Sequence, residues 1–320
     1  MRKVIFDTDV CSDDAAALLL ALKEEDVEVL AVTTVTGGVL LKQATLNALQ
    51  TCEIAGSDVP VYVGAAKPLF KDPFVTTSAH GADGMGACGL IHPTTKPVEG
   101  VHASDAILDL VRKYPGQIDM LAVAPLTNLG LAILKDRDTM QQLKSITIMG
   151  TGGFGPGNVN AVAEANVFSD AESYDLVLGL DVPTTILGFD LCIGDSAFSA
   201  EEMQMMETSG KAAAEYVAKA SGKLLQYNMN VKNNPFVDVC DAVAVGCYLW
   251  PEIVKKSVPC NARVAKEGDF YGQVIFWTEE HKRVMESHGL PFDFTKNQCT
   301  VVAEIDTDLF KEKFKASLLA

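Results

Sequence analysis

The feature of this sequence that most restricts its fold is an alternation of short apolar runs with helical patterns along the first two-thirds of the chain. Strands are expected at residues 4–6, 27–34, 59–63, 118–123, 145–149 and 184–187. Helices are expected between them, at about residues 13–23, 40–55, 104–113, from 127 onward, and at 170–180. Such alternation is typical of a mostly parallel sheet with right-handed crossovers. We therefore predict an α/β fold of the doubly wound, Rossmann-like type.

The rest of the chain divides into three stretches of different character. Residues 65–102 lack periodicity and are rich in Gly and Pro, so we interpret them as a mobile flap near the functional site. Residues 197–232 are rich in Met and helical in pattern, and the tail has strands near 262–264, 272–277 and 299–305 before a closing helix. No linker, repeat or low-complexity tract separates these stretches, so we expect a single domain that spans residues 1–320.

Composition and charge narrow the classes of partner. The formal net charge of −16 argues against nucleic acid and against an anionic membrane surface, because both are bound through Lys and Arg. No apolar stretch approaches about 18 residues, the length of a transmembrane helix. The eight cysteines are scattered without a C-x-x-C pair, and Met1-Arg2-Lys3 leads directly into a strand rather than a signal peptide. We therefore expect a cytoplasmic protein with reduced thiols.

An acidic cluster follows the first apolar run. Asp7, Asp9, Asp13 and Asp14 fall within eight residues, between the first strand and a long apolar helix. Two like charges about 4 Å apart repel by about 4 kcal/mol at an effective dielectric near 20, so a fold that crowds four carboxylates holds a cation or keeps some of them protonated. A helix N-cap would need only one Asp. The cluster therefore predicts a site for a cation that prefers oxygen ligands, Ca²⁺ or Mg²⁺.

A glycine-rich run follows the expected strand at 145–149. Residues 150–155 match G-x-G-x-x-G, a pattern of dinucleotide sites, but residues 156–158 do not begin a helix, so we interpret the run as a turn. The segment beyond it carries Asn158, Glu164 and Asn166. Their amide and carboxylate groups can donate to and accept from the hydroxyls of a sugar, although ordinary loop polarity is the alternative.

Two further carboxylates, Asp238 and Asp241, precede an apolar helix that ends near Trp250. One can be the N-cap of this helix, and the other can add a distant ligand to the N-terminal acidic cluster. The five histidines show no H-x-x-x-H or H-E-x-x-H spacing, and no G-x-S-x-G occurs. A zinc hydrolase and a nucleophile-elbow hydrolase are therefore unsupported.

Several motifs occur in the order found in the inosine-uridine preferring nucleoside hydrolase family, which this chain resembles most strongly over roughly residues 1–255. The first is D-T-D-x-x-x-D-D-A at residues 7–15, which looks like the family signature. The later motifs are Gly37-Gly38, His80-Gly81-x-Asp83-Gly84, Ala124-Pro125-Leu126-Thr127-Asn128, Gly157-Asn158, Ala163-Glu164-x-Asn166, and an Asp that opens the helix ending at Trp250-Pro251-Glu252. Several motifs in order are far more specific than any one of them.

The resemblance implies a nucleoside hydrolase fold with Ca²⁺ bound at the strand ends. It implies hydrolysis of the N-glycosidic bond of a ribonucleoside to free base and ribose, by a Ca²⁺-bound water that Asp9 activates as general base. It also implies a small-molecule ribonucleoside as the partner, a role in purine or pyrimidine salvage, and a homodimer or homotetramer.

The resemblance also assigns roles to individual residues. The Ca²⁺ ligands would be Asp9, Asp14, the backbone carbonyl of Val123 and a C-terminal Asp. For this last ligand we choose Asp241 over Asp238, because the family has its Asp ten residues before the Pro of the helix end, as Asp241 is before Pro251. Asp7 would support the metal ligands without binding the metal itself. The substrate-binding residues would be Asp13, at the ribose 2′-hydroxyl, with His80, Asn158, Glu164 and Asn166.

The sequence departs from the common family pattern in three places. Cys240 stands where many members have the His that protonates the leaving base, and a thiol is a weaker acid for that step. Some members carry Cys there, so Asp9 and Cys240 are our candidate catalytic residues. Val10-Cys11 replaces the usual Pro-Gly, and Gly38 stands where Asn is often found, which removes one polar contact near the sugar.

Two other functions compete with this assignment. Residues 5–9 also resemble the start of haloacid-dehalogenase-type phosphatases, with Asp7 as nucleophile and Mg²⁺ bound, but the second acidic pair is incomplete after Gly194-Asp195-Ser196. The other alternative is a non-catalytic nucleoside-binding protein that has lost the leaving-group acid, because Cys240 replaces it. Release of phosphate would favour the first alternative, and binding without turnover the second.

Overall fold

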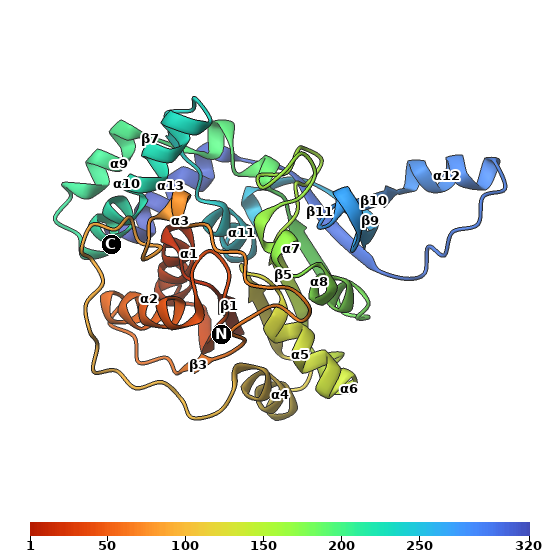
Figure 1. Ribbon diagram of the computed structural model, residues 1–320, viewed down its shortest axis with the longest axis horizontal. Helices are drawn as coiled ribbons and strands as arrows, with labels where there is room; N and C mark the ends of the chain where they lie inside the picture. Colours follow the sequence, from red (N-terminus) through yellow and green to blue (C-terminus); the bar gives the residue numbers. More distant parts are fainter.

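A nine-stranded sheet forms the centre of the molecule in this computed structural model, which describes residues 1–320 (Figure 1). The strands follow one another across the sheet in the order β10-β9-β11-β6-β5-β4-β1-β2-β3. All neighbours from β3 to β11 pair in parallel, whereas β9 is antiparallel to both β11 and β10. The strands are β1 (Arg2–Thr8), β2 (Val27–Thr34), β3 (Val61–Val63), β4 (Ile118–Ala122), β5 (Ser145–Met149), β6 (Thr184–Leu187), β9 (Val254–Val264), β10 (Val274–Thr278) and β11 (Gln298–Ile305).

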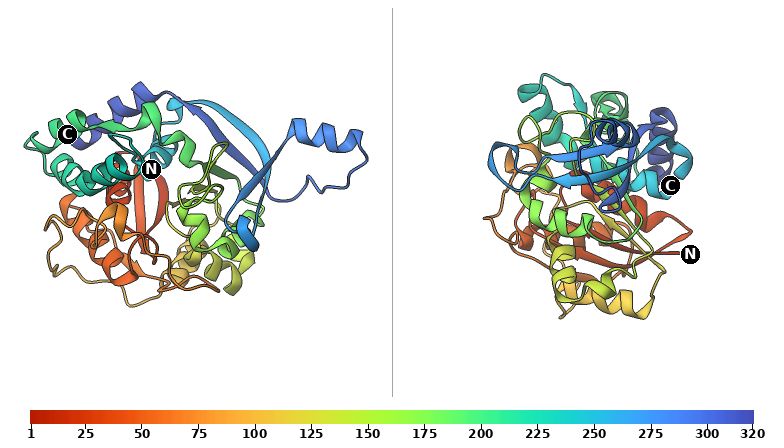
Figure 2. Two further views of the ribbon diagram at one scale, coloured as in Figure 1. Left: turned by 45° about the horizontal axis from the view of Figure 1, so that its top comes forward. Right: turned by 90° about the vertical axis from the view of Figure 1, so that its right-hand side faces the viewer.

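Helices cover both faces of the sheet, so the prediction of a doubly wound α/β fold is confirmed (Figures 1 and 2). On one face pack α1 (Ser12–Lys23), α2 (Leu41–Ile54), α9 (Ala200–Glu207), α10 (Ala212–Val231), α11 (Cys240–Leu249) and α13 (Thr307–Leu319). On the other face pack α4 (Ala103–Lys113), α5 (Thr127–Lys135), α6 (Arg137–Met140), α7 (Ala165–Ser169) and α8 (Ala171–Leu178).

Two hydrophobic cores result, one on each side of the sheet. Successive residues of β1 point to opposite faces, so Val4 and Phe6 enter the core with α1 and α11, while Ile5 enters the core with α4 and α5. Because both faces are buried, the strand has no polar alternation, which explains why its sequence is a continuous apolar run. No helix of the chain is both long and apolar enough to cross a membrane.

The strand order places the end of β1 at a point where the direction of winding changes. β1 lies between β2, which follows it in the chain, and β4, from which the winding continues the other way. In open α/β sheets, ligands bind at such a switch point, outside the carboxyl ends of the strands. The acidic cluster therefore lies where the fold favours a binding site.

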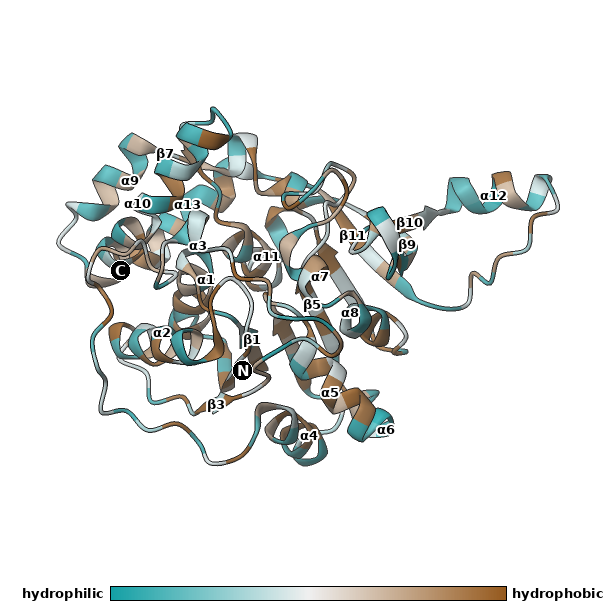
Figure 3. Ribbon diagram, viewed as in Figure 1, coloured by the Kyte–Doolittle hydropathy of each residue, from teal (hydrophilic) through white to brown (hydrophobic).

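The C-terminal part contains elements that the sequence did not predict. β9 begins at Val254, well before the expected strand at 262–264, and α12 (Glu279–Ser287) follows β10. Figures 1 and 2 show α12 standing away from the body of the molecule, and none of its residues is buried. Figure 3 shows that its surface mixes hydrophilic and hydrophobic residues. α12 contains only two large apolar residues, Val284 and Met285, so its sequence lacks the repeated apolar positions that mark a helix packed on a core.

Three smaller expectations need correction or refinement. The helix expected to begin at Ser104 begins at Ala103, because the side chain of His102 caps it by accepting a hydrogen bond from the Ser104 N–H. The helix expected at 170–180 is α8, capped by the side chain of Asp170, and a short additional helix, α7, precedes it. Between residues 65 and 102 the only helix is α3 (Thr77–His80). The Met-rich helical stretch is confirmed as α9 and α10.

Candidate functional site

The candidate site begins where β1 ends. A turn through Asp9 and Val10 leads from Thr8 to Cys11, the N-cap of α1. Val10 has a positive φ of 25°, an unusual conformation for a β-branched residue that costs on the order of 1–3 kcal/mol. The Val10 N–H donates to Thr8 Oγ1 (3.2 Å), and Asn47 Nδ2 donates to the Val10 carbonyl (2.8 Å). The surrounding structure thus holds a strained turn that contains Asp9 and leads into α1, the helix that carries Asp13 and Asp14.

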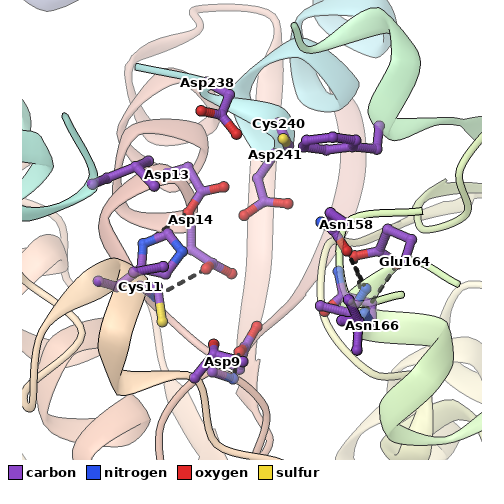
Figure 4. Close-up of a pocket in the computed structure, with 18 of the residues that line it drawn as sticks. Asp9, Cys11, Asp13, Asp14, Asn158, Glu164, Asn166, Asp238, Cys240 and Asp241 are labelled. Carbon is purple, nitrogen blue, oxygen red and sulfur yellow. Dashed lines mark hydrogen bonds and ion pairs between the residues drawn. The ribbon is translucent and has the colours of Figure 1, made fainter. Parts of the chain in front are cut away.

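One pocket brings the sequence-predicted site residues together, although they come from segments far apart in the chain (Figure 4). The acidic turn after β1 lies on one side of it, the loop 158–166 lies opposite, and the first turn of α11 lies above. The C-terminal half of α10 and the segment around α3 complete the lining. The predicted residues in this lining are Asp9, Asp13, Asp14, His80, Val123, Asn158, Glu164, Asn166, Cys240 and Asp241.

Two overlapping groups of side chains in this pocket can hold a metal ion. The first is Asp9, Cys11 and Asp14, and the second is Asp13, Asp14 and Asp241; in each group the ligand atoms lie within 4.8 Å of one another. Asp14 belongs to both groups. Its carboxylate is fixed by hydrogen bonds from Thr8 Oγ1 (2.6 Å) and from the Cys11 N–H (2.8 Å). These donors leave Asp14 oriented between Asp9 and Asp241.

Asp9 is held by a glycine turn after β2. The Gly38 N–H donates to Asp9 Oδ2, and a Cβ atom at Gly37 would lie 2.6 Å from Asp9 Cγ, a distance that no side chain allows. Glycine at position 37 therefore lets the backbone approach the carboxylate closely. Burial raises the pKa of Asp9 to about 7, and the Gly38 N–H opposes this shift.

The remaining carboxylates of the cluster fit a cation. Burial raises the pKa of Asp14 and of Asp241 well above the ordinary value, and neighbouring carboxylates raise both further. Asp241 is only 4% exposed, and its carboxyl group has a side-chain hydrogen bond with the carboxyl group of Asp14. Two buried carboxyl groups in contact require either a shared proton or a cation between them. Oxygen donors converging from separate elements are the ligands that hard divalent cations prefer.

The raised pKa values predict how pH affects the cation-free protein. In the unfolded chain these carboxylic acids lose their protons near pH 4, whereas folded Asp9 and Glu164 keep theirs until about pH 7. Between these values the folded state binds more protons, so the free energy of unfolding should decrease as pH rises from about 5 to 8 in the presence of a chelator. Urea denaturation at several pH values measures this. Excess divalent cation should restore stability at pH 8; a chelated protein that becomes more stable with pH would contradict the prediction.

The side of the pocket opposite the acidic turn is built by the start of α7. Glu164 is the N-cap of α7, and its carboxylate accepts hydrogen bonds from the N–H groups of Asn166 (2.9 Å) and Val167 (3.2 Å). Asn166 Nδ2 donates to the carbonyl of Val123 (3.3 Å), and Asn158 Oδ1 accepts from the Ala165 N–H (2.9 Å). Burial raises the pKa of Glu164 to about 7, against the N–H groups that lower it. These contacts fix a row of amide and carboxylate groups toward the pocket.

His80 and Asp7 occupy different positions relative to the pocket. His80 Nδ1 lies 2.9 Å from Ser12 Oγ and 3.7 Å from Asp13 Oδ1, so it meets Asp13 at the pocket wall. Asp7 is fully buried within the sheet, where its Oδ1 accepts from Thr33 Oγ1 (2.5 Å) and Asn128 Nδ2 (2.8 Å). Asp7 does not line the pocket. It therefore cannot serve as the nucleophile of a phosphatase, and the position fits a supporting role.

Asp238 and Asp241 have different environments. Asp241 lies in the first turn of α11 beside Asp13 and Asp14, and the N-cap of α11 is Val239 rather than either Asp. Asp238 instead accepts a hydrogen bond from Asn228 and forms an ion pair with Lys232 (3.3 Å). The expectation that one of the two caps the helix is therefore wrong.

A less polar part of the pocket includes residues that the sequence did not single out. Phe189, Leu224 and Tyr227 line it together with Cys240, and Lys232 is the only Lys or Arg in the lining. The Lys232 ammonium lies 5.2 Å from the ring centroid of Phe189. Contact with the Cys192 thiol, and then burial, raise the pKa of the Cys240 thiol well above its ordinary value. No motif marks these residues, because the pocket forms from separate helices and loops.

The chain is similar to known proteins over most of its length. A family model described as inosine-uridine preferring nucleoside hydrolase matches residues 4–312. Uridine nucleosidase 1 of Arabidopsis thaliana is 41% identical over 192 residues, which are 59% of this chain and 57% of that protein. The pyrimidine-specific ribonucleoside hydrolase RihB of Escherichia coli is 28% identical over 277 residues, 86% of this chain and 87% of that protein. The alignments with the first plant and fungal relatives span 57% to 65% of those proteins' length.

The fold is shared with a solved nucleoside hydrolase structure. The plant nucleoside hydrolase PpNRh1 superposes with a TM-score of 0.92 at 27% sequence identity, and the match covers 100% of this chain and 99% of that one. The superposed region includes the strands and loops that form the pocket. Together with the family match over residues 4–312, this similarity shows that the chain belongs to the inosine-uridine preferring nucleoside hydrolase family.

Proposed function

We propose that this protein hydrolyses the N-glycosidic bond of ribonucleosides, giving free base and ribose. The observation that carries the proposal is the pocket itself. Its one side has the carboxylates Asp9, Asp14 and Asp241, and its other side has amide and carboxylate groups fixed to bind hydroxyls. Between them, a sugar can lie with its anomeric carbon beside the acidic cluster.

We propose Ca²⁺ as the cation, held by Asp9, Asp14, Asp241 and the carbonyl of Val123. The contact between the buried carboxyl groups of Asp14 and Asp241, and the all-oxygen ligand set of these residues, support this choice. Ca²⁺ bound there would lower the pKa of a water molecule and neutralise the repulsion among the carboxylates. Asp241 is preferred to Asp238 because the ion pair with Lys232 already satisfies Asp238.

Asp9 would act as the general base for the attacking water. Its position at the end of β1, within the group of carboxylates that would hold the cation, places it where it can accept a proton from the attacking water. As the bond to the base breaks, the sugar develops positive charge, as in other glycoside hydrolysis. Carboxylates fixed around the sugar in a buried site stabilise that charge.

The sugar hydroxyls would be bound on both sides of the pocket. We assign Asp13 to the 2′-hydroxyl, and Asn158, Glu164 and Asn166 to the remaining hydroxyls, with His80 supporting Asp13. The contact of His80 with Asp13 at 3.7 Å supports this pairing. Ionised or not, these groups offer the donors and acceptors that hydroxyls require.

The base would lie in the less polar part of the pocket, against Phe189, Tyr227 and Cys240. Because the Cys240 thiol stays protonated at neutral pH, it can donate a weak hydrogen bond to the departing base. Lys232, held by Asp238, can place its positive charge beside a base that gains negative charge as it leaves. The proton that completes the free base then comes from solvent.

A Cys240 variant tests the role of the thiol. Cys240→Ala should lower kcat by about tenfold, while the pH–rate profile between about pH 6 and 8 keeps its shape, because the thiol does not titrate in that range. Cys240→Ser, which keeps a donor, should lose less activity. Steady-state kinetics across pH measures both effects. Loss of one limb of the profile in Cys240→Ala would instead make the thiol a titrating acid.

A substrate panel tests the proposed function against its alternatives. The purified protein with Ca²⁺ is given inosine, uridine and other ribonucleosides, and in parallel a phosphate monoester. We expect free base from at least one ribonucleoside and no phosphate. Phosphate release would overturn the proposal in favour of a phosphatase, and saturable nucleoside binding without turnover would overturn it in favour of a binding protein.

Several broader features remain part of the proposal. We propose that residues 1–320 act as one nucleoside hydrolase domain, that the protein functions in the cytoplasm in purine or pyrimidine salvage, and that it forms a homodimer or homotetramer. All eight cysteines are free thiols, which is common in a reducing compartment and supports the location. Analytical ultracentrifugation would determine the oligomeric state.

A further inference from the structure

Asp190 lies behind the pocket, at the point where its base-binding and sugar-binding sides meet. It belongs to η1 (Phe189–Leu191), a short helix after β6, and directly follows Phe189. Phe189 lines the pocket, whereas Asp190 does not. We propose that Asp190 is a positioning residue, which fixes the glycine-rich run at residues 150–155 against η1 and so sets the distance between the two sides. This inference rests on the proposed function.

The glycine-rich run packs directly on the Asp190 carboxylate. The Phe154 N–H donates to Asp190 Oδ2 at 2.9 Å. A Cβ atom at Gly153 would lie 2.7 Å from Asp190 Oδ2, and one at Gly155 would lie 2.9 Å from Asp190 Cβ. Side chains at these two positions would collide with Asp190, so glycine is what lets the run approach it. The run that matches a dinucleotide motif in the sequence thus binds a carboxylate of the chain itself.

Thr151 connects the same run to both sides of the pocket. Its carbonyl accepts a hydrogen bond from the Phe189 N–H at 2.9 Å, and its own N–H is one of the backbone donors to the Glu164 carboxylate. One residue thus contacts Phe189, which we assign to the base, and Glu164, which we assign to the sugar. Asp190 holds the run through Phe154, three residues further along the chain. The position of Asp190 therefore affects how the two sides lie relative to each other.

Two features of this arrangement destabilise the folded chain. Asp190 Oδ1 is buried and has no hydrogen-bond partner, and burial raises the pKa of the carboxyl group. Thr151, which is 1% exposed, has a φ of 133°, a conformation that residues other than glycine rarely adopt. Unfavourable features of this kind are concentrated at functional sites, where they hold a required geometry. Packing alone does not account for a carboxyl group at position 190.

Each side of the pocket is also fixed by contacts of its own. On the sugar-binding side, Asn158 Oδ1 accepts from the Ala165 N–H (2.9 Å), and the Asn158 N–H donates to the Ala163 carbonyl (3.1 Å). On the base-binding side, Phe189 is 7% exposed and packs in the core shared with α1 and α11. Loss of the Asp190 contact should therefore shift the two sides relative to each other without disrupting either. A ligand that spans both sides should bind more weakly, and a ligand that occupies one side should not.

Steady-state kinetics of Asp190 variants test this, with the ribonucleoside that the wild type hydrolyses. Asp190→Ala should raise KM about tenfold, while kcat stays within about threefold because the carboxylates that would hold the cation are untouched. Inhibition constants for ribose alone and for the free base alone should stay within about twofold, whereas a generally loosened pocket would weaken all three ligands. Asp190→Asn keeps an oxygen that can accept from the Phe154 N–H, so its KM should stay within about threefold of the wild type.

Phe154→Pro removes the donor of the same hydrogen bond, and Phe154→Ala is its matched control. Both variants lose a ring that is 51% exposed, but only proline lacks the N–H. Phe154→Pro should reproduce the rise in KM of Asp190→Ala, and the double variant should be no worse than either single one. Phe154→Ala should behave as the wild type.

Circular dichroism and thermal unfolding show which variants are folded, and Phe154→Pro provides the test if Asp190→Ala is not. A folded variant of either kind with an unchanged KM would overturn the inference, as would equal weakening of nucleoside, ribose and base. If the wild type binds ribonucleosides without hydrolysing them, the proposed function fails, and dissociation constants from calorimetry replace KM in the same comparison. A wild type that neither binds nor hydrolyses ribonucleosides would overturn both.

Discussion

Replacing Asp9 with alanine is expected to lower kcat for nucleoside hydrolysis by about 10³-fold or more. The substitution removes the proposed general base, whose loss alone is worth roughly 10²- to 10⁴-fold, and it also removes a proposed Ca²⁺ ligand. The effect should appear in kcat at saturating substrate, because the groups that bind the sugar hydroxyls on the opposite side are untouched. Initial rates at saturating Ca²⁺ measure it.

The fold should survive this change. Asp9→Ala removes a buried carboxylate whose pKa is raised, so in the presence of a chelator near pH 8 the variant should be as stable as the wild type or more stable. Asp269→Ala, which removes an exposed carboxylate that does not line the pocket, is the matched control and should leave kcat unchanged. An Asp9→Ala protein with full activity would falsify the assignment of Asp9 as the base.

Replacing Asp241 with asparagine should weaken Ca²⁺ binding by about 100-fold, whereas the same change at Asp238 should alter it by less than about twofold. The reason lies in their surroundings. Asp241 lies beside Asp13 and Asp14 and contacts the Asp14 carboxyl group, while Asp238 is paired with Lys232 at 3.3 Å. Isothermal titration with Ca²⁺ measures both affinities.

The two variants form a matched pair, because they make the same change three residues apart at the start of α11. Asp238→Asn should instead impair turnover, since it frees Lys232 from its position beside Phe189. If Asp238→Asn proved to be the variant that loses Ca²⁺, the choice between the two residues would be reversed.

The fold and the acidic half of the site could be predicted from sequence for physical reasons. Strands buried on both faces appear as continuous apolar runs, and the ends of parallel strands meet at one edge of the sheet. Asp9 and Asp14, which follow β1 directly, therefore had to lie at that edge. The loop 158–166, which follows β5, reaches the same edge.

The remaining parts depend on contacts between distant segments. The close packing of Cys11 against Gly38 joins two turns, and the pair of Lys232 and Asp238 joins the end of α10 to the start of α11. Neither contact produces a periodic or local pattern in the amino-acid sequence from which it could be predicted. α12 was not predicted for another reason, because its nine residues include only two large apolar ones, Val284 and Met285.

The most direct test of the account is to measure both products of one reaction. Uridine, and separately inosine, is incubated with the purified protein, and free base and ribose are quantified by chromatography as a function of time. The account predicts equal amounts of base and ribose, a reaction that stops on addition of a calcium chelator, and recovery when Ca²⁺ is returned in excess. Protein that binds Ca²⁺ but releases no base from any ribonucleoside would contradict it.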